Sequence, residues 1–386
     1  MSTRAHPLYP GALGAREPRR SRAEPPHHRW SFRVGRLAGI PVYLHGTFVL
    51  LLAWIALSRL LQGHGLYAAM TGVALVAAVF AVVVLHELGH ALAARHYGIP
   101  TRDITLYPIG GVGRLERLPE KPSQELAVAF AGPAVNLVLA GLALLALAAM
   151  KAPVGPRAVN VVGGPLLTNV LWFNLGLAGF NLLPAFPMDG GRVLRALLAL
   201  RMDRVRATDW AVRIGRVMAV AFGLFALYGQ PLLLFIAIFV WMAAEQEAVE
   251  VHVRSSLEGA TVADATSTDF RALPADARVE DAVEHALAGA QEAFPVIDDG
   301  SVVGMVSRRE LLRAVTSGEA GAPVTDVMRR EFPSADVGEP LVDALQRLTA
   351  ANLPALPVTR RGELVGLLTT ARIGELAMMR EHHAHA

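Results

Sequence analysis

Residues 82–94 read Val-Val-Val-Leu-His-Glu-Leu-Gly-His-Ala-Leu-Ala-Ala. The two histidines, His86 and His90, are four residues apart, so a helix places them one turn apart on the same face. Two imidazoles in this arrangement can bind one Zn²⁺, and Glu87 beside them is the usual general base of a metalloprotease. The pattern therefore predicts a hydrolytic zinc site on a helix.

The residues before this pattern are apolar. The run Ala68–Leu85 contains no charged side chain and is 18 residues long, which is close to the length that spans a bilayer. An ionisable residue within a membrane-spanning helix indicates a functional site. We therefore expect the zinc site to lie near one end of a transmembrane helix.

Composition supports a membrane protein joined to a soluble domain. Of 386 residues, 53% are hydrophobic and 18% are charged, against about 25% charged in ordinary soluble chains. The long apolar runs end near residue 255, and the remainder is typical of a soluble α/β domain. The net charge of +3 does not indicate nucleic-acid binding. The absence of cysteine leaves His, Asp and Glu as metal ligands.

We predict a polytopic α-helical membrane protein with about six transmembrane helices in residues 37–250. The predicted spans are Ile40–Leu61, Leu66–Ala94, Leu126–Met150, Leu166–Pro187, Trp210–Tyr228 and Pro231–Ala244. Residues 1–36 contain eight Arg and five Pro, which predicts a disordered basic cytoplasmic arm and argues against a secretory signal peptide.

Basic residues on the connections predict the orientation. The arm, residues 95–121 and residues 192–206 are rich in Arg and Lys, whereas the alternate connections carry few. Cytoplasmic loops are enriched in basic residues, so both termini and the active site are expected on the cytoplasmic side of the cell membrane.

Residues 101–118 predict a short β-hairpin between the second and third spans. The β-branched alternation there is interrupted by Gly110 and Gly111. An extended edge at this place can take a substrate strand by β-addition, and a plain connector is the alternative.

The C-terminal third is an internal repeat with an offset of 62 residues. Ala293–Val296 recurs as Ala355–Val358, and Gly304–Ser307 recurs as Gly366–Thr369. The repeat predicts a tandem α/β domain over residues 258–380, with halves 258–318 and 320–380.

A zinc hydrolase needs a third protein ligand and an open position for water. Asp189 is the best candidate, because two prolines and two glycines break the helix around it and allow its carboxylate to turn. A helix-capping role for Asp189 fits the spacing equally well. Asn136, an amide within an apolar span, is either an oxyanion donor or the source of an interhelical hydrogen bond.

Three segments together resemble one family: the histidine pair, the Gly132–Asn136 segment and the Asn181–Gly191 segment. In this order they are similar to the site-2 protease family of intramembrane zinc metalloproteases, in its bacterial and archaeal branch with a C-terminal pair of CBS domains. The resemblance implies His86, His90 and Asp189 as ligands of one Zn²⁺ per chain, Glu87 as catalytic base and Asn136 as an oxyanion-stabilising or substrate-orienting residue. It implies cleavage of transmembrane segments of membrane-bound regulators, such as an anti-sigma factor.

The 62-residue repeat resembles a CBS pair, a module that binds adenine nucleotides in many proteins. Ser307 and Glu310 in the first half match the ribose-contacting pattern, whereas the second half has Thr369 followed by Arg372 at the acidic position. The pair is therefore expected to be either a nucleotide sensor or a structural unit that supports a homodimer.

Two functions of other classes remain open from the residues alone. One is a CBS-regulated membrane transporter with His86 and Asp189 in an ion pathway, although no inverted repeat is visible in the spans. The other is a non-catalytic membrane adaptor that binds client helices. Stoichiometric zinc and proteolysis distinguish both from a protease.

Overall fold

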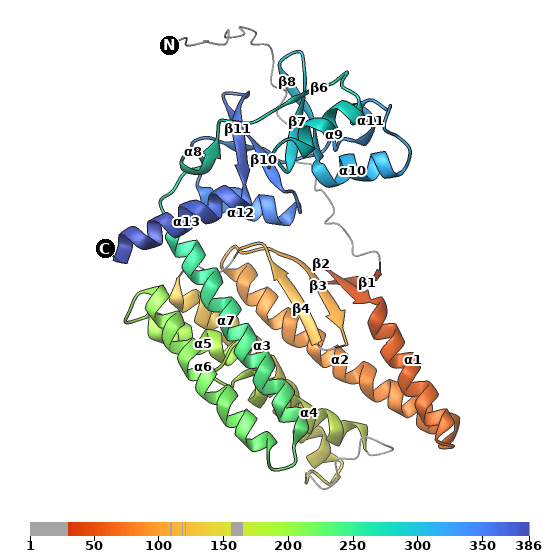
Figure 1. The fold of residues 1–386 in the computed structure, drawn as a ribbon. Helices are drawn as coiled ribbons and strands as arrows, with labels where there is room; N and C mark the ends of the chain where they lie inside the picture. The colour runs from red at the N-terminus through yellow and green to blue at the C-terminus, as the bar shows by residue number, and fades with distance from the viewer. Residues whose placement is uncertain (1–29, 109, 118, 120, 156–164, 386) are drawn as a thin grey trace, which may run out of the picture. The chain divides into compact units, whose positions relative to one another are not determined.

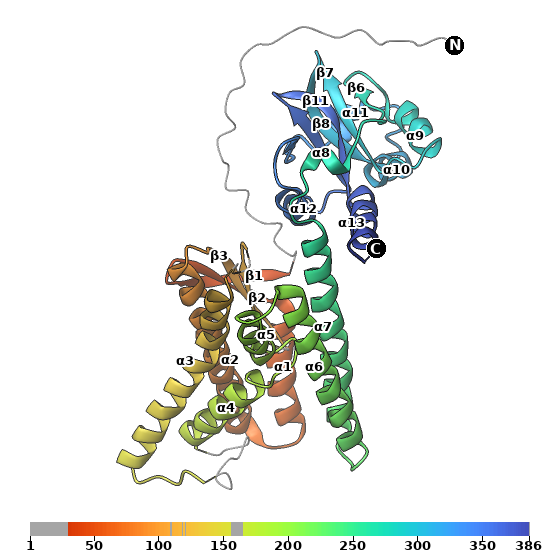
Figure 2. The same cartoon turned by 90° about the vertical axis from the view of Figure 1, so that its left-hand side faces the viewer.

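The computed structural model describes residues 30–108, 110–117, 119, 121–155 and 165–385 (Figures 1 and 2). They form two compact units, of which the first ends at Val251 and the second begins at His252. Residues 1–29 of the predicted basic arm lie outside the described residues.

A four-stranded sheet opens the first unit. Its order is β1-β2-β3-β4, with β2 and β3 parallel and the other neighbours antiparallel. The strands are β1 (Ser31–Leu37), β2 (Ile40–His45), β3 (Thr101–Tyr107) and β4 (Gly110–Leu115). The pair β3–β4 is the hairpin that the alternation predicted, and β4 is an outer strand.

The sheet corrects two predicted boundaries. The arm was expected to be disordered through residue 36, but residues 31–36 belong to β1. The first span was expected to begin at Ile40, but Ile40–His45 form β2 and the helix starts at Gly46. The physical reason is that Ile40 and Val42 alternate toward the interior, where they are buried, so these residues satisfy the period of a strand.

Seven helices begin among the described residues of the first unit. They are α1 (Gly46–Leu61), α2 (Gly65–His96), α3 (Pro122–Ala149), α4 (Leu166–Asn181), α5 (Asp189–Ala199), α6 (Arg204–Ala226) and α7 (Pro231–Ser256). Among the described residues, α2, α3 and α7 are long and apolar enough to cross a membrane, and α1 is a shorter apolar helix. The predicted fourth span stops at Asn181, because the chain turns before α5.

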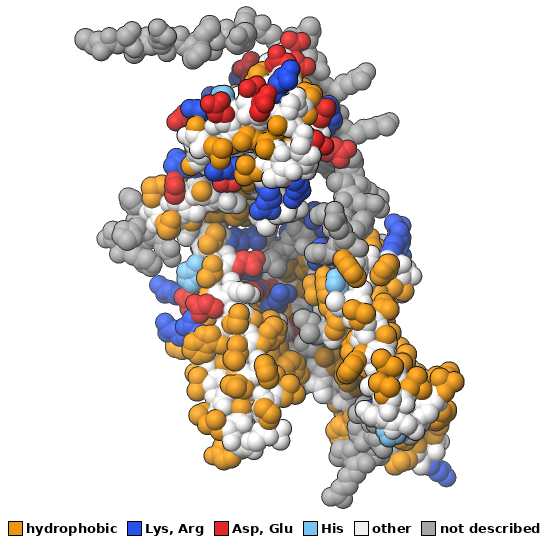
Figure 3. Space-filling model, turned by 45° about the vertical axis from the view of Figure 1, so that its right-hand side comes forward, with side chains coloured by type: hydrophobic (Ala, Val, Ile, Leu, Met, Phe, Trp, Pro, Cys, Tyr) orange, Lys and Arg blue, Asp and Glu red, His pale blue; other side chains and the backbone are white. Residues whose placement is uncertain are grey.

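On the face shown in Figure 3, hydrophobic side chains cover most of the lower part of the helical unit, whereas charged side chains are frequent on the second unit. In the most apolar 18-residue stretch of α7, only 17% is buried within the protein, so most of the apolar surface of this stretch faces outward. Exposed apolar surface on this scale is stable in lipid and unfavourable in water. The chain is therefore a membrane protein.

Close packing of α2 against α3 positions the site. Gly89, within the zinc pattern, faces Ala131 of α3, and a Cβ added at Gly89 would lie 2.8 Å from the Ala131 carbonyl oxygen. Small residues of this kind allow two helix backbones to approach closely in a membrane. The sheet packs on the same helix, since Val42 and Leu106 form a cluster with Phe80 and Val84.

The second unit contains the repeat. Its first half holds α8 (Val262–Ala265), β5 (Thr266–Ser267), β6 (Leu273–Pro274), α9 (Val279–Leu287), β7 (Ala293–Asp298), β8 (Ser301–Ser307) and α10 (Arg308–Thr316). The second half holds α11 (Val324–Val327), β9 (Ala335–Asp336), α12 (Leu341–Ala350), β10 (Ala355–Arg360), β11 (Glu363–Thr369) and α13 (Thr370–His385). Helix α9 and strands β7 and β8 recur as α12, β10 and β11 at the predicted offset.

The two halves exchange their first segments. Strand β5 pairs with β11 in the sheet of the second half, and Val262 lies in the same core as Leu356. Reciprocally, Val324 and Met328 of the second half lie in the core of the first. The sequence boundary between 318 and 320 therefore separates two repeats but not two independent cores.

Candidate metal centre

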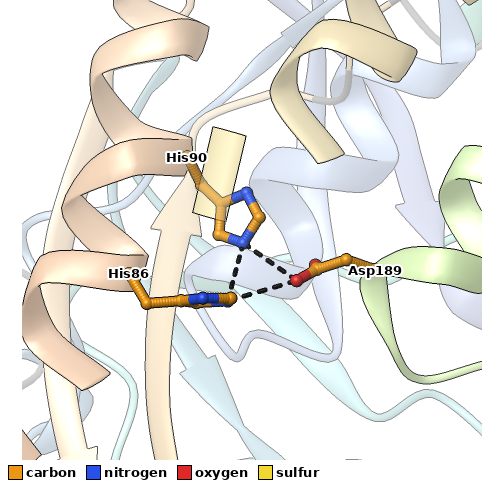
Figure 4. A group of neighbouring side chains, drawn as sticks. All are labelled: His86, His90 and Asp189. Atoms are coloured by element: carbon orange, nitrogen blue, oxygen red, sulfur yellow. Dashed lines mark hydrogen bonds and ion pairs between the residues drawn. The ribbon is translucent and has the colours of Figure 1, made fainter. Parts of the chain in front are cut away.

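His86 and His90 project from the same face of α2 toward the beginning of α5 (Figure 4). Their Nε2 atoms lie 3.1 Å apart. His86 is 4% exposed and His90 is half-buried. One turn of a regular helix brings the two imidazoles together, as the spacing of four residues predicted.

Asp189, the first residue of α5, completes the group. Its Oδ2 lies 3.1 Å from His86 Nε2 and 3.2 Å from His90 Nε2. The turn between α4 and α5 aims this carboxylate inward, and Gly190 allows the turn because an added Cβ would collide with the Leu182 and Leu183 backbone. A side chain 103 residues from His86 thus reaches the same point.

Hydrogen bonds on the far side of each imidazole orient the two rings. His90 Nδ1 lies 2.7 Å from the Val128 carbonyl oxygen, and His86 Nδ1 lies 3.2 Å from Asn136 Oδ1, both on α3. An oxygen of either kind can only accept, so each Nδ1–H donates and each Nε2 keeps its lone pair. This arrangement is typical of metal-ligating histidines.

The geometry fits a zinc ion. Among the described residues, His86, His90 and Asp189 form a group whose ligand atoms all lie within 4.8 Å of one another. Ligand atoms around a tetrahedral Zn²⁺ are about 3.3 Å apart, since each lies about 2.0–2.1 Å from the ion. Two nitrogen lone pairs and a carboxylate oxygen at 3.1–3.2 Å repel each other unless a cation lies between them.

Gly132 leaves room for the two rings. A Cβ at this position of α3 would lie 2.7 Å from His86 Nε2 and closer still to His90 Nε2. Any larger residue here would occupy the space of the two Nε2 atoms. Sequence reasoning singled out the Gly132–Asn136 segment for its amide and missed the glycine, although a Gly-Pro pair within a span indicates close approach of a neighbour.

Glu87 contacts the outer strand of the sheet. Its Oε2 accepts a hydrogen bond of 3.1 Å from the Gly113 N–H. Cβ atoms built at Gly111 and Gly113 would each come within 2.9 Å of the Glu87 side chain, so both glycines permit this approach. The predicted hairpin and the predicted base are therefore adjacent in space, which the sequence did not indicate.

Comparison with known proteins decides the family. Residues 74–163 and 157–222 match the family described as Peptidase family M50, and residues 262–317 and 324–373 match the CBS domain. Zinc metalloprotease MJ0392 of Methanocaldococcus jannaschii is 34% identical over 278 residues, which cover 72% of this chain and 78% of that protein.

The chain belongs to peptidase family M50, the site-2 proteases. Rip3 of Mycobacterium tuberculosis, another relative, is 32% identical over 372 residues, or 89% of this chain and 92% of that protein. The solved structure of the site-2 protease from Methanocaldococcus jannaschii has 35% sequence identity to this chain. The alignment covers 57% of this chain and 95% of that chain, with a TM-score of 0.42.

Membership in this family confirms several predictions. The chain is an intramembrane metalloprotease, its cofactor is zinc and its C-terminal repeat is a CBS pair. The transporter and adaptor alternatives are set aside.

The CBS residues singled out from the sequence already have hydrogen-bond partners within the second unit. Ser307 and Glu310 form a capping box at the start of α10, and Glu310 Oε1 accepts a hydrogen bond of 2.6 Å from Arg329 Nε. Desolvation favours the protonated form of Glu310, but the hydrogen bonds from Ser307 and Arg329 outweigh it and hold the pKa of Glu310 below its usual value. In the second half, Arg372 pairs with Glu375.

Proposed function

We propose that the protein hydrolyses peptide bonds in or near transmembrane segments of membrane-bound regulators, such as an anti-sigma factor, with zinc held by His86, His90 and Asp189. The observation that carries this proposal is the convergence of these three side chains from α2 and α5 inside a bundle with long apolar helices. A protease that acts on membrane segments needs its metal centre within such a bundle.

In this proposal Zn²⁺, when bound, polarises the scissile carbonyl and lowers the pKa of a water molecule. Glu87, one residue from His86, takes the proton of the attacking water and delivers it to the leaving amine. Asn136 keeps His86 in the ligating tautomer through Oδ1. Its buried Nδ2 has no hydrogen-bond partner among the described residues, so it remains available to donate to a developing oxyanion.

We further propose that the substrate binds in an extended conformation along β4. A helical carbonyl is shielded by its own hydrogen bond, so a transmembrane segment must unwind before it can be cleaved. The outer strand β4 lies beside Glu87 through Gly113 and can offer its backbone for β-addition.

The distribution of basic residues supports six spans with both termini and the active site on the cytoplasmic side. The CBS pair is proposed to modulate cleavage by binding an adenine nucleotide, with Ser307 and Glu310 at the ribose. A CBS pair that only supports a homodimer is the alternative, and equilibrium dialysis with AMP distinguishes the two.

The test is cleavage of a transmembrane substrate by the full-length protein in liposomes. Glu87→Gln keeps the shape of the side chain but removes the base, so cleavage should fall by at least about 100-fold while zinc is retained. Full activity of a folded Glu87→Gln protein would refute the role of Glu87. The same inactive variant, placed in the native membrane, should trap substrates for identification.

A further inference from the structure

One face of α3 carries the residues that orient or accommodate the imidazoles of His86 and His90. Four residues at spacings of three and four form a stripe along the helix: Glu125, Val128, Gly132 and Asn136. The last three of these orient or accommodate His86 and His90, as described above. The remaining member, Glu125, faces α5, the helix that begins with Asp189.

Glu125 binds Arg195 of α5. Arg195 Nε donates to Glu125 Oε1 over 2.8 Å, and Nη2 of the same guanidinium bonds the same oxygen. Arg195 Nη1 bonds Glu247 of α7. The guanidinium also lies over the ring of Phe186, 5.2 Å from its centroid, in the turn that leads into α5. One side chain thus connects α5 to α3, to α7 and to its own entry turn.

This cluster is buried and balanced in charge. The side chain of Arg195 is 1% exposed, and that of Glu125 is 5% exposed. Arg204 pairs with the second oxygen of Glu125 at 3.3 Å, so two arginines face two carboxylates. Such a buried cluster is weak evidence for stability, because desolvation offsets much of the attraction. Its directional bonds instead fix the position of the short helix α5.

We propose that Arg195 is a positioning residue that holds Asp189 in register with His86 and His90, through the Glu125 face of α3. The proposal rests on the proposed role of Asp189 as a zinc ligand. Asp189 lies six residues before Arg195, or about 9 Å along the helix. A shift of α5 against α3 would move the Asp189 carboxylate away from the two imidazoles, which α3 holds independently.

Arg195→Lys tests this proposal in the full-length protein. Lysine keeps the positive charge that the two carboxylates need, but it lacks the planar fork that bonds Glu125 and Glu247 together. Arg216→Lys is the matched control. Arg216 of α6 pairs with Glu245 and lies over the ring of Trp241, both on α7, so these contacts join α6 to α7 and do not involve α5. Zinc affinity is measured by competition with a chromophoric chelator, and visible absorption of the Co²⁺-loaded protein reports ligand geometry.

The expected result is a loss of zinc affinity of about 10- to 100-fold in Arg195→Lys, with an altered Co²⁺ spectrum and a melting temperature of the metal-free protein close to that of Arg216→Lys. Arg216→Lys should retain the parental affinity and spectrum. Parental affinity and spectrum in folded Arg195→Lys would overturn the proposal, as would an equal loss in the control.

Two further variants keep the outcomes separate. Asp189→Asn should weaken zinc binding. If it does not, the proposed ligand set is wrong, whereas failure of Arg195→Lys alone refutes only the positioning role. If Arg195→Lys does not fold, Glu247→Gln retains Arg195 and its bonds to Glu125 but removes the charge of one partner. It should lower zinc affinity below that of Arg216→Lys, and an unchanged affinity would overturn the proposal.

Discussion

Replacing Gly132 with alanine adds one methyl group to α3 and should displace the two histidines that are proposed to bind zinc. The added Cβ would lie 2.7 Å from His86 Nε2, whereas an ordinary contact is at least 3.4 Å, so this ring must retreat by about 0.7 Å. His90 must move further, because its Nε2 is closer to the added atom. Zinc–ligand distances tolerate deviations of about 0.2 Å, so neither nitrogen can remain in its ligating position.

We expect Gly132→Ala to lower zinc affinity by at least about 100-fold. Loss of a residue that hydrogen-bonds a metal-binding histidine typically lowers metal affinity by about 10- to 100-fold, and here the histidine rings themselves must move. The assay is competition with a chromophoric chelator on the detergent-solubilised protein. Gly141→Ala is the matched control, since it makes the same substitution on the same helix at a position with nothing within 4 Å of the added Cβ.

The control should bind zinc like the parent and should be slightly more stable, because alanine favours a helix over glycine. Parental zinc affinity in Gly132→Ala would refute the reasoning, since the imidazoles would then lie elsewhere in the folded protein. Equal losses in both variants would also contradict it, because the effect would then come from the helix and not from contact with the rings.

Three further predictions concern the base, a ligand partner and the CBS pair. Gly113→Ala places a Cβ 2.9 Å from Glu87 Oε2 and should reduce cleavage by about 100-fold while zinc content is unchanged; loss of zinc would contradict it. Asn136→Leu removes the acceptor for His86 Nδ1–H and should weaken zinc binding by about 10- to 100-fold, which chelator competition measures. Glu310 has a lowered pKa, so its stabilising contribution should be present above pH 4.5, its ordinary value, and be lost as the pH falls through the lowered pKa. Thermal unfolding of Glu310→Gln against pH should lack that contribution, and an unchanged pH dependence would contradict its role.

The three residues proposed to bind zinc could be singled out from the sequence, because the signals that mark them lie within short stretches of the chain. Two histidines at a spacing of four define one helix face, and the prolines and glycines around Asp189 mark a turn that can aim a carboxylate. The 62-residue repeat likewise indicates a duplicated unit, and the family comparison confirms that this unit is a CBS pair.

Contacts between residues far apart in the chain could not be predicted from the sequence in the same way. Nothing in the sequence pairs Arg195 with Glu125, which is 70 residues away, or places Gly113 against Glu87. Strand β2 was assigned to a membrane span because its residues are apolar, and hydropathy alone cannot separate a buried strand from the start of a helix. The exchange of segments between the CBS halves is equally invisible, since repeats of equal length give no sign of how their cores are shared.

The most direct test of the account is removal and return of the metal in the full-length protein. Chelation should abolish cleavage of a transmembrane substrate in liposomes, and one equivalent of Zn²⁺ per chain should restore it in the parent but not in Asp189→Asn. Full cleavage by protein shown to be free of metal, or complete recovery of Asp189→Asn with one equivalent of zinc, would contradict the central claim that His86, His90 and Asp189 hold the zinc on which proteolysis depends.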